Sequence, residues 1–330
     1  MDDCSQSRYQ VWVLAYFIDN FSPFIFEFRQ GFGIRWYGFA YILGFLFGYV
    51  LLKRLAEKRY CCLPPDQVGD FVTQVALVGV LLGGRLGYIL FYGLGTALQD
   101  PLSIFRVWEG GMASHGGMIG LFLFTLWYAR RHKLSWLSLG DNLAVVAPVG
   151  LFFGRCANFI NGELFGRPTD VPWAMQFPKE LYDVPPLADR AMAMARSINP
   201  PPGSVEQLIE QGRHDPGIQA LFRTILTPRH PSQIYEALLE GVFLFLVLWL
   251  ARTRFRAPRG LITGIFFVLY ACVRILSEMF REPDAPLIGG LTRGQFLSLF
   301  LIVAGLGFIA FSMIKPSFES CDEAASNPSN

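Results

Sequence analysis

One stretch of the chain combines residue types that bind phosphate with residue types that move protons. It reads GRCANFINGELFGRPTD, residues 154–170, and it ends an apolar run. Arg155 offers a planar guanidinium group, which can bind phosphate through paired hydrogen bonds, and Asn158 and Asn161 offer neutral donors. The carboxylate of Glu163 can orient a catalytic group or accept a proton. The stretch is therefore a candidate site, which the rest of the chain must complete.

Other ionisable residues interrupt apolar segments, where a charge costs about 2.5–3.5 kcal/mol at the centre of a membrane-spanning helix. Tyr270, Arg274 and Glu278 recur at intervals of four residues and therefore share one helix face. This spacing is compatible with an ion pair between helices and with a binding site. His115, in SHGGMIG, has the side chain best suited to a general base near neutral pH. Two further interruptions are Arg85 and Asp141.

The composition is that of a membrane protein. Of the 330 residues, 52% are hydrophobic and 16% are charged, whereas roughly 25% are charged in an ordinary soluble domain. The net charge is +2, and no basic run with interleaved aromatic residues indicates a nucleic-acid partner. The six cysteines form no CxxC pair and have no histidines at ligand spacing. We therefore expect no metal ion, no cofactor and no disulfide framework.

Seven apolar segments predict an all-α polytopic membrane protein. Several are shorter than the ~20 residues that span a bilayer, so we expect them to tilt or to thin the bilayer locally. The segments are residues 35–52, 70–92, 114–130, 139–157, 235–250, 261–280 and 292–314.

Positive charges predict the orientation of these segments. They cluster after the first, third and fifth segments, and by the positive-inside rule these connections face the cytoplasm, so the N-terminus lies outside and the C-terminus inside. The long connection 158–234 then lies outside, either as a periplasmic cap with helical stretches near 188–197 and 204–225 or as a disordered insert. The predicted parts are 1–157 with four helices, the cap 158–234, 235–314 with three helices, and the cytoplasmic tail 315–330.

This topology brings the polar residues to the outer ends of their helices. Scattered structural ion pairs would not need to share one depth, whereas a site would. Two arginines at the outer leaflet would meet the phosphate of a lipid headgroup, so we expect an enzyme or a carrier for a lipid phosphate. Tyr37 lies at the same level, although interfacial aromatic residues are also common anchors. The converging residues are His115, Arg155, Asn158, Asn161, Glu163, Arg274 and Glu278.

The segment GRCANFINGELFG resembles the signature of the bacterial phosphatidylglycerol:prolipoprotein diacylglyceryl transferases. Further familial blocks follow the family's order over most of the chain outside residues 178–228: RWYGFAYILGF, GRLGYILFY, SHGGMIG, HPSQIYEALLEG, RILSEMFREPD and RGQFLSL. The resemblance implies a seven-span enzyme of the bacterial inner membrane. It would move the diacylglyceryl group of phosphatidylglycerol onto the lipobox cysteine of a preprolipoprotein signal peptide, forming a thioether and releasing glycerol phosphate.

The resemblance also implies roles for individual residues. His115 is the expected base for the thiol, with Glu163 or Glu278 as an orienting group or alternative acceptor. Arg155 and Arg274 would stabilise the departing phosphate. The positions carried over are Tyr37, His115, Arg155, Asn158, Glu163, Gly166, Tyr270, Arg274 and Glu278, with Arg85 and Asp141 at familiar positions of less defined role. The expected substrate-binding residues are Arg155, Asn158, Asn161, Gly166, Tyr270 and Arg274.

Two features depart from the family pattern. Arg293 stands in TRGQ, where the family often has Ser-Met-Gly-Gln, and the insert at 178–228 looks longer than usual. The alternative function is a transporter or scramblase for lipid phosphates, which would favour helices broken near the middle of the membrane and polar groups spread across the bundle. The chain has no GxSxG or HExxH motif, which argues against a hydrolase.

Overall fold

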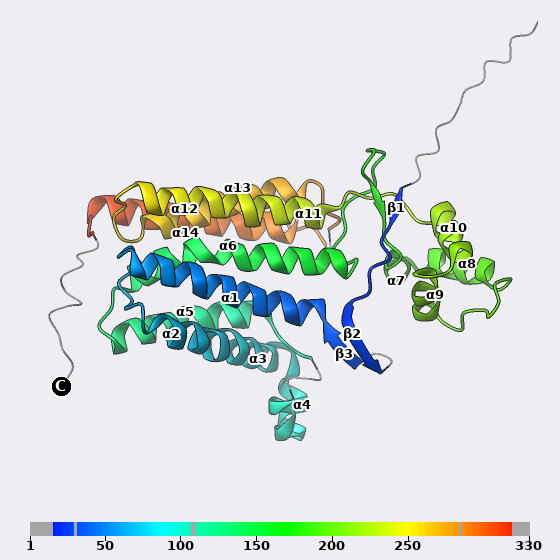
Figure 1. Ribbon diagram of the computed structural model, residues 1–330, viewed down its shortest axis with the longest axis horizontal. Helices are drawn as coiled ribbons and strands as arrows, with labels where there is room; N and C mark the ends of the chain where they lie inside the picture. The colour runs from blue at the N-terminus through cyan, green and yellow to red at the C-terminus, as the bar shows by residue number, and fades with distance from the viewer. Residues whose placement is uncertain (1–15, 30–31, 107–109, 284–285, 319–330) are drawn as a thin grey trace, which may run out of the picture.

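The molecule is an elongated bundle of helices with a smaller helical unit at one end (Figure 1). The computed structural model describes residues 16–29, 32–106, 110–283 and 286–318. We call residues 174–226 the head. The main chain of the head follows the end of α6 (Trp136–Ile160) and leads back into the bundle at α11 (Ser232–Glu236).

Helices make up most of the described chain, and π-helical segments (η1, η2, η5) and a 3-10 segment (η3) occur among them. The remaining elements, in chain order, are β1 (Phe17–Ile18), β2 (Phe24–Arg29), β3 (Phe32–Arg35), α1 (Trp36–Glu57), α2 (Val68–Gln74), η1 (Val75–Leu82), α3 (Gly83–Tyr88), η2 (Ile89–Gly93), α4 (Leu94–Gln99), η3 (Pro101–Phe105), α5 (Ser114–Arg131), β4 (Met175–Gln176), α7 (Glu180–Asp183), α8 (Pro185–Ala195), α9 (Val205–Gly212), α10 (Pro216–Ile225), η5 (Ala237–Phe243), α12 (Leu244–Arg254), α13 (Leu261–Glu278) and α14 (Arg293–Ile314).

Six helical runs within the described residues are long and apolar enough to cross a membrane, which confirms a mainly helical, polytopic membrane protein. They match six of the seven predicted segments. The described chain also contains two two-stranded sheets, which the all-α prediction did not include: a parallel pair β1–β4 and an antiparallel pair β2–β3. The six runs are α1, Val68–Gln99, α6, Ser232–Arg254, α13 and α14.

The predicted segment 114–130 forms α5, an 18-residue helix that is not one of these six runs. It begins with SHGG and ends with two arginines, and these residues lower its mean hydropathy. The chain reverses direction between α5, which ends at Arg131, and α6, which begins at Trp136. Trp136 Nε1 donates to Thr125 Oγ1 at 3.2 Å across this turn. The start of α5 and the end of α6 therefore lie at the same end of the bundle.

Glycines bring α5 into close contact with η1 and α3. A Cβ atom at Gly83 would lie 2.8 Å from the Cα of Gly120, and one at Gly116 would lie 2.6 Å from the carbonyl oxygen of Gly83. Small residues of this kind let the backbones of membrane helices approach closely. The two glycine-rich blocks GGRLG and SHGGMIG are therefore the two sides of one helix interface.

Asp141, which the sequence resemblance left without a defined role, caps another helix from within the bundle. Its side chain is fully buried and accepts hydrogen bonds from Gly260 N at 2.7 Å and from both Thr263 N and Thr263 Oγ1 at 2.8 Å. Gly260 has a φ of +91°, which favours glycine, and it is the N-cap of α13. Asp141 therefore joins the start of α6 to the start of α13.

Arg85 organises a loop by binding backbone carbonyl groups. Its side chain is buried and donates to the carbonyl oxygens of Ile104 at 2.9 Å and Gly111 at 3.0 Å. It also donates to the carbonyl oxygens of Ser103, Arg106 and Gly110. Arg85 thus satisfies the carbonyl groups at the end of η3, and this loop leads into α5.

The head folds around its own apolar core rather than forming a disordered insert. Leu208 and Ile218 are fully buried there, and the Asp215 side chain accepts a hydrogen bond from Gly217 N at 2.7 Å to cap α10. The parallel pair β1–β4 ties the segment before the bundle to the head. Asp19, directly after β1, is buried at this junction.

We expect Asp141→Ala to lower the stability of the bundle by about 2–3 kcal/mol, because it leaves buried N–H groups of α13 without an acceptor. For a chain of this size, this corresponds to a fall of roughly 5 °C or more in the midpoint of thermal unfolding. The measurement is thermal unfolding of the detergent-solubilised chain, with the exposed Asp70→Ala as the matched control. Equal midpoints for the two variants would contradict the capping role.

The pH dependence of the head should report the burial of Asp19. Burial raises the pKa of this carboxyl from 3.8 to about 7, only partly offset by the Phe21 N–H and the nearby Lys179 and Arg213. Because the folded state then binds the proton more tightly than the unfolded state, stability falls as the pH rises from about 4 to 7 and levels off above 7.

We therefore expect hydrogen-exchange protection of residues 16–22, corrected for intrinsic rates, to be at least roughly tenfold lower at pH 8 than at pH 5. Asp19→Asn cannot ionise and should remove this difference. A wild-type protection factor that is constant over this range would show that Asp19 ionises without cost.

Candidate functional site

The end of α6 is shaped by the sequence Asn-Gly-Glu. Glu163 N donates to Asn158 O at 3.1 Å and Gly162 N donates to Phe159 O at 2.9 Å, which is the hydrogen-bond pattern of a Schellman motif. Gly162 has a φ of +61°, as this motif requires of the residue after the cap. The turn brings Glu163 back over the last turn of α6, beside Asn158.

Tyr37, Asn158 and Glu163 form one hydrogen-bonded group, which we call the Tyr–Asn–Glu triangle. The Tyr37 hydroxyl donates to Glu163 Oε1, and Asn158 Nδ2 donates to the same oxygen at 2.9 Å and to the Tyr37 hydroxyl. Gln233 Nε2 holds the backbone carbonyl of Glu163 at 2.7 Å. The triangle therefore joins α1, the end of α6 and the start of α11.

A cluster of buried ion pairs lies on the neighbouring part of α6. Arg155 contacts Glu236 at 2.8 Å through Nη1, and Glu240 at 3.1 Å through Nε and at 2.9 Å through Nη2. Arg274 Nη1 contacts the other oxygens of the same two carboxylates, Glu236 Oε1 and Glu240 Oε1, both at 3.1 Å. Both glutamate side chains are 0% exposed. Two carboxylates from one helix face thus hold two guanidinium groups from α6 and α13.

Two more ionised residues complete this cluster. Arg274 Nη2 pairs with Glu278, which was predicted to share its face of α13, and Arg281 Nη1 pairs with Glu236 Oε1 at 3.3 Å. The cluster then contains three positive and three negative side chains. Removing ions from water costs several kcal/mol each, and a buried ion pair offsets this only with good geometry and further hydrogen bonds. In this cluster, the multiple ion pairs and hydrogen bonds offset the cost of removing the charges from water. We call Arg155, Glu236, Glu240, Arg274, Glu278 and Arg281 the ion cluster.

The ion cluster retains hydrogen-bonding capacity. A guanidinium group carries five N–H donors. Hydrogen bonds to the carboxylates of described residues occupy two on Arg155, whose Nη1 also forms an ion pair with Glu236, and three on Arg274. At least two N–H donors therefore remain on each arginine. Their side chains are 15% and 13% exposed, so these groups can be approached from outside the cluster.

α6 connects the ion cluster to the Tyr–Asn–Glu triangle. Arg155 and Asn158 are three residues apart and lie on one helix face. Arg155 also interacts electrostatically with Tyr37 and with Tyr270, and Tyr270 lies one turn before Arg274 on α13. The structure thus brings together Tyr37, Arg155, Asn158, Glu163, Tyr270, Arg274 and Glu278 of the predicted site residues.

His115 lies at the same end of the bundle but has different neighbours. It is half-buried at the start of α5, and its ring packs edge-to-face on Phe91 and Tyr92 at centroid distances of 5.0 and 5.8 Å. Among the residues that the structure describes, no hydrogen bond links His115 to the ion cluster or to the triangle. The aromatic rings of η2 therefore set the orientation of this imidazole.

Gly166 and Asn161 shape the connection beyond α6. A Cβ atom at Gly166 would lie 2.5 Å from the carbonyl oxygens of both His230 and Phe280, so only glycine fits between these two strands of backbone. Asn161 is the C-cap of α6, and its buried Oδ1 has no hydrogen-bond partner among the described residues. This oxygen is available to a bound donor.

The head is attached to the site by a second set of ion pairs. Arg229 contacts Glu180 at 2.6 Å, Glu282 at 3.0 Å and the carbonyl oxygen of Gly166 at 3.2 Å. Lys179 of the head interacts electrostatically with Glu163, although burial lowers the pKa of its amine. The head therefore touches the chain segments on both sides of the candidate site.

Sequence reasoning missed three members of the ion cluster. Glu236, Glu240 and Arg281 stand in the familial blocks HPSQIYEALLEG and RILSEMFREPD, but none was singled out. The available signal was the pair of glutamates four residues apart inside an apolar run, since such charges are expensive in a membrane. The same argument had identified Arg274 and Glu278.

Comparison with known proteins agrees with the family resemblance. The model of a family described as prolipoprotein diacylglyceryl transferase matches residues 23–311. Three similar proteins are all named phosphatidylglycerol--prolipoprotein diacylglyceryl transferase: those of Bdellovibrio bacteriovorus (40% identity over 88% of this chain and 92% of the relative), Rhodospirillum centenum (43% over 86% and 89%) and Sodalis glossinidius (41% over 89% and 93%). The chain therefore belongs to the prolipoprotein diacylglyceryl transferase family.

Proposed function

We propose that this chain transfers the diacylglyceryl group of phosphatidylglycerol to the thiol of the lipobox cysteine of a preprolipoprotein. The thiolate sulfur attacks the glycerol carbon that carries the phosphate ester. The C–S bond forms as the C–O bond to the phosphate breaks, and glycerol phosphate leaves with the electron pair. The observation that carries the proposal is the pair of arginines, Arg155 and Arg274, held side by side by Glu236 and Glu240.

The two arginines are proposed to stabilise the leaving phosphate. Negative charge grows on its oxygens as the ester bond breaks, and N–H donors that are already oriented lower the free energy of that transition state. Glu236 and Glu240 keep both guanidinium groups in place before substrate arrives. The donors left on Arg155 and Arg274 are then available to the phosphate oxygens.

The Tyr–Asn–Glu triangle is proposed to bind the headgroup beside the arginines. Its hydroxyl, amide and carboxylate suit the hydroxyl groups of the headgroup glycerol, which both donate and accept hydrogen bonds. Asn161, whose buried oxygen has no hydrogen-bond partner among the described residues, adds an acceptor on the same turn. Tyr270 and Gly166 complete the proposed substrate-binding set. Tyr270 lies next to both arginines, and Gly166 allows the loop after α6 to pack closely against the backbone of His230 and Phe280.

The thiol proton requires an acceptor, because the thiolate is the nucleophile and a thiol of pKa ~8.5 is mostly protonated at neutral pH. His115 is the proposed base, and Glu163 and Glu278 are the alternative acceptors. His115 is oriented by Phe91 and Tyr92 at the end of the bundle that also carries the ion cluster. Glu278 pairs with Arg274, so its protonation would be coupled to the phosphate site.

The membrane arrangement is part of the proposal. α5 is the proposed seventh crossing, which places the N-terminus and the head on the periplasmic side of the bacterial inner membrane and the C-terminus in the cytoplasm. Positive charges after α1, α5 and α12 support this orientation. The proposed parts are residues 1–157, the periplasmic cap 158–234, residues 235–314 and the tail 315–330.

The reaction can be tested with the purified chain, labelled phosphatidylglycerol and a lipobox peptide. We expect a thioether-linked lipid peptide with the wild type, and a rate lower by about 10²–10³ with Arg155→Ala, since a transition-state donor is lost. Arg223→Ala, an exposed arginine of the head, is the matched control and should retain full activity. Absence of the product together with lipid flux across vesicles would instead favour the transporter function.

The base is identified in the same assay. His115→Gln should reduce the rate by roughly 10²-fold or more, because the proposed general base is lost. Full activity of His115→Gln, with loss of activity in Glu278→Gln or Glu163→Gln, would assign the proton to the corresponding carboxylate and leave the transferase proposal intact.

Glu240 is proposed as a positioning residue, because it holds Arg155 and Arg274 together. We expect Glu240→Gln to lower kcat by up to roughly 10²-fold, the cost of a small misplacement of a reacting group, with a smaller change in KM. Glu180→Gln is the matched control, since it breaks the similarly buried ion pair with Arg229. A comparable loss of thermal stability and of kcat in both variants would reduce Glu240 to a purely structural role.

A further inference from the structure

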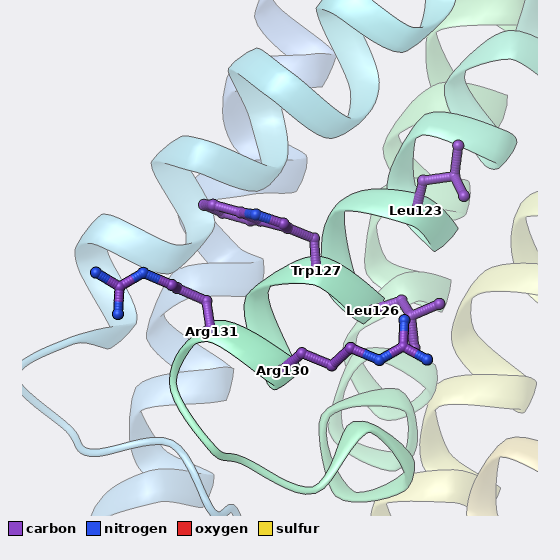
Figure 2. Close-up of a pocket in the computed structure, with 5 residues that line it drawn as sticks. All are labelled: Leu123, Leu126, Trp127, Arg130 and Arg131. Carbon is purple, nitrogen blue, oxygen red and sulfur yellow. The ribbon is translucent and has the colours of Figure 1, made fainter.

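A cavity of about 450 Å³ lies on the surface of α5 near its C-terminal end. Leu123, Leu126, Trp127, Arg130 and Arg131 line it (Figure 2). Figure 2 shows Trp127 and Arg131 on one side of the helix and Leu126 and Arg130 on the other. Leu126 thus stands one turn before Arg130, and Trp127 stands one turn before Arg131.

A second cavity, of about 350 Å³, shares Leu123 and Trp127 with the first. It runs between α5 and the helical run formed by α2, η1 and α3, where Gly83 and Gly120 bring the two helices together. The close approach leaves a shallow apolar furrow beside the contact. The residues that line this cavity are Gln74, Val78, Leu82, Gly83, Leu86, Gly120, Leu123, Phe124 and Trp127. We call the two cavities together the α5 furrow.

The length of the α5 furrow corresponds to one leaflet of a bilayer. Gln74 and Leu86 are twelve residues apart, which is about 15–18 Å along a helix at up to 1.5 Å per residue. Half of the ~30 Å hydrocarbon core of a bilayer is about 15 Å. An acyl chain of a phospholipid therefore fits the furrow from end to end.

The end of the furrow that carries the arginines has the charge of an interfacial anion site. Arg130 and Arg131 are both exposed, and neither forms an ion pair with a residue that the structure describes. Trp127 is 54% exposed beside them, and tryptophan is enriched at the membrane–water interface. A phosphate at this end of the furrow would receive charge-assisted hydrogen bonds from Arg131, which stands beside Trp127. Arg130 adds positive charge to the lining of the same cavity.

We propose that the α5 furrow binds an anionic phospholipid, with its phosphate beside Arg131, at the end that Arg130 also lines, and an acyl chain along Leu123, Leu82 and Leu86. This site is separate from the candidate active site, with which it shares no residue. It lies towards the opposite end of the bundle, since α5 runs antiparallel to α6 and Arg155 stands near the end of α6. The bound lipid is a structural or regulatory ligand, and the site does not depend on the proposed transfer reaction.

The test uses Trp127 as a reporter in the full-length chain reconstituted into phosphatidylcholine vesicles. Brominated phosphatidic acid is the probe, because it is anionic, carries a quencher in its acyl chains and lacks the glycerol headgroup that the proposed reaction releases. The Trp127 signal is the difference between the wild type and Trp127→Phe. Brominated phosphatidylcholine gives the quenching that arises from random contact with lipid.

We expect phosphatidic acid to quench Trp127 at concentrations at least about tenfold lower than phosphatidylcholine, because the arginines attract an anionic headgroup. The double variant Arg130→Gln/Arg131→Gln should abolish this preference. Arg54→Gln/Arg254→Gln removes two exposed arginines from α1 and α12 and should preserve it.

A preference that survives in Arg130→Gln/Arg131→Gln, or that is lost equally in the control variant, would overturn the proposal in favour of general attraction of anionic lipid to a basic surface. Equal quenching by the two lipids in the wild type would also overturn it. Transferase activity of both double variants verifies that the chain remains folded, since neither variant touches the ion cluster.

Discussion

Burial of charge in the ion cluster is the constraint on which the arrangement of the bundle depends. Arg155 comes from α6, Glu236 and Glu240 from the run α11–η5, and Arg274 and Glu278 from α13. Each arginine would be strongly destabilising if its partners were absent, because an unpaired ion in a low-dielectric interior costs several kcal/mol. Each of these helices must therefore be rotated about its axis so that its charged side chains face the ion cluster.

The same pairing bears on how a phosphate can be bound. The three positive and three negative side chains of the cluster sum to zero, so directed N–H donors on Arg155 and Arg274, rather than an excess of positive charge, would hold the anion. Donors that are fixed before the substrate arrives need no reorganisation during the reaction, which is the condition for effective electrostatic catalysis. A neutral cluster also remains stable when no anion is bound.

The local backbone at the end of α6 complements this long-range pairing. The Schellman motif at Asn161 and Gly162 returns Glu163 to Asn158 and Tyr37, and the chain then passes Gly166, where only glycine fits. From there Arg229 connects the loop to Glu180 of the head. The end of α6, the packing of the loop at Gly166 and the attachment of the head therefore follow one another within residues 158–166. Each of these contacts limits the movement of the site residues.

The sequence by itself determined the helical segments and much of the site, because both depend on local composition. An apolar run long enough to cross a bilayer must form a helix to satisfy its backbone, so the segments were predictable from hydropathy alone. The interval of four between Arg274 and Glu278 predicted that they share one helix face, and GRCANFINGELFG gave the family resemblance. The weak point was α5, whose glycines and polar residues reduce the apolar signal.

Only the tertiary structure decided which charges meet. Glu236 and Glu240 are separated from Arg155 by more than eighty residues, and no periodicity within one helix reveals the face that a distant helix presents to it. For the same reason Asp141 and Arg85 proved to be anchors for α13 and for a loop, while His115 packs against aromatic rings of η2. Partner choice follows from the relative rotation and register of packed helices, and these are set by all contacts of the bundle at once.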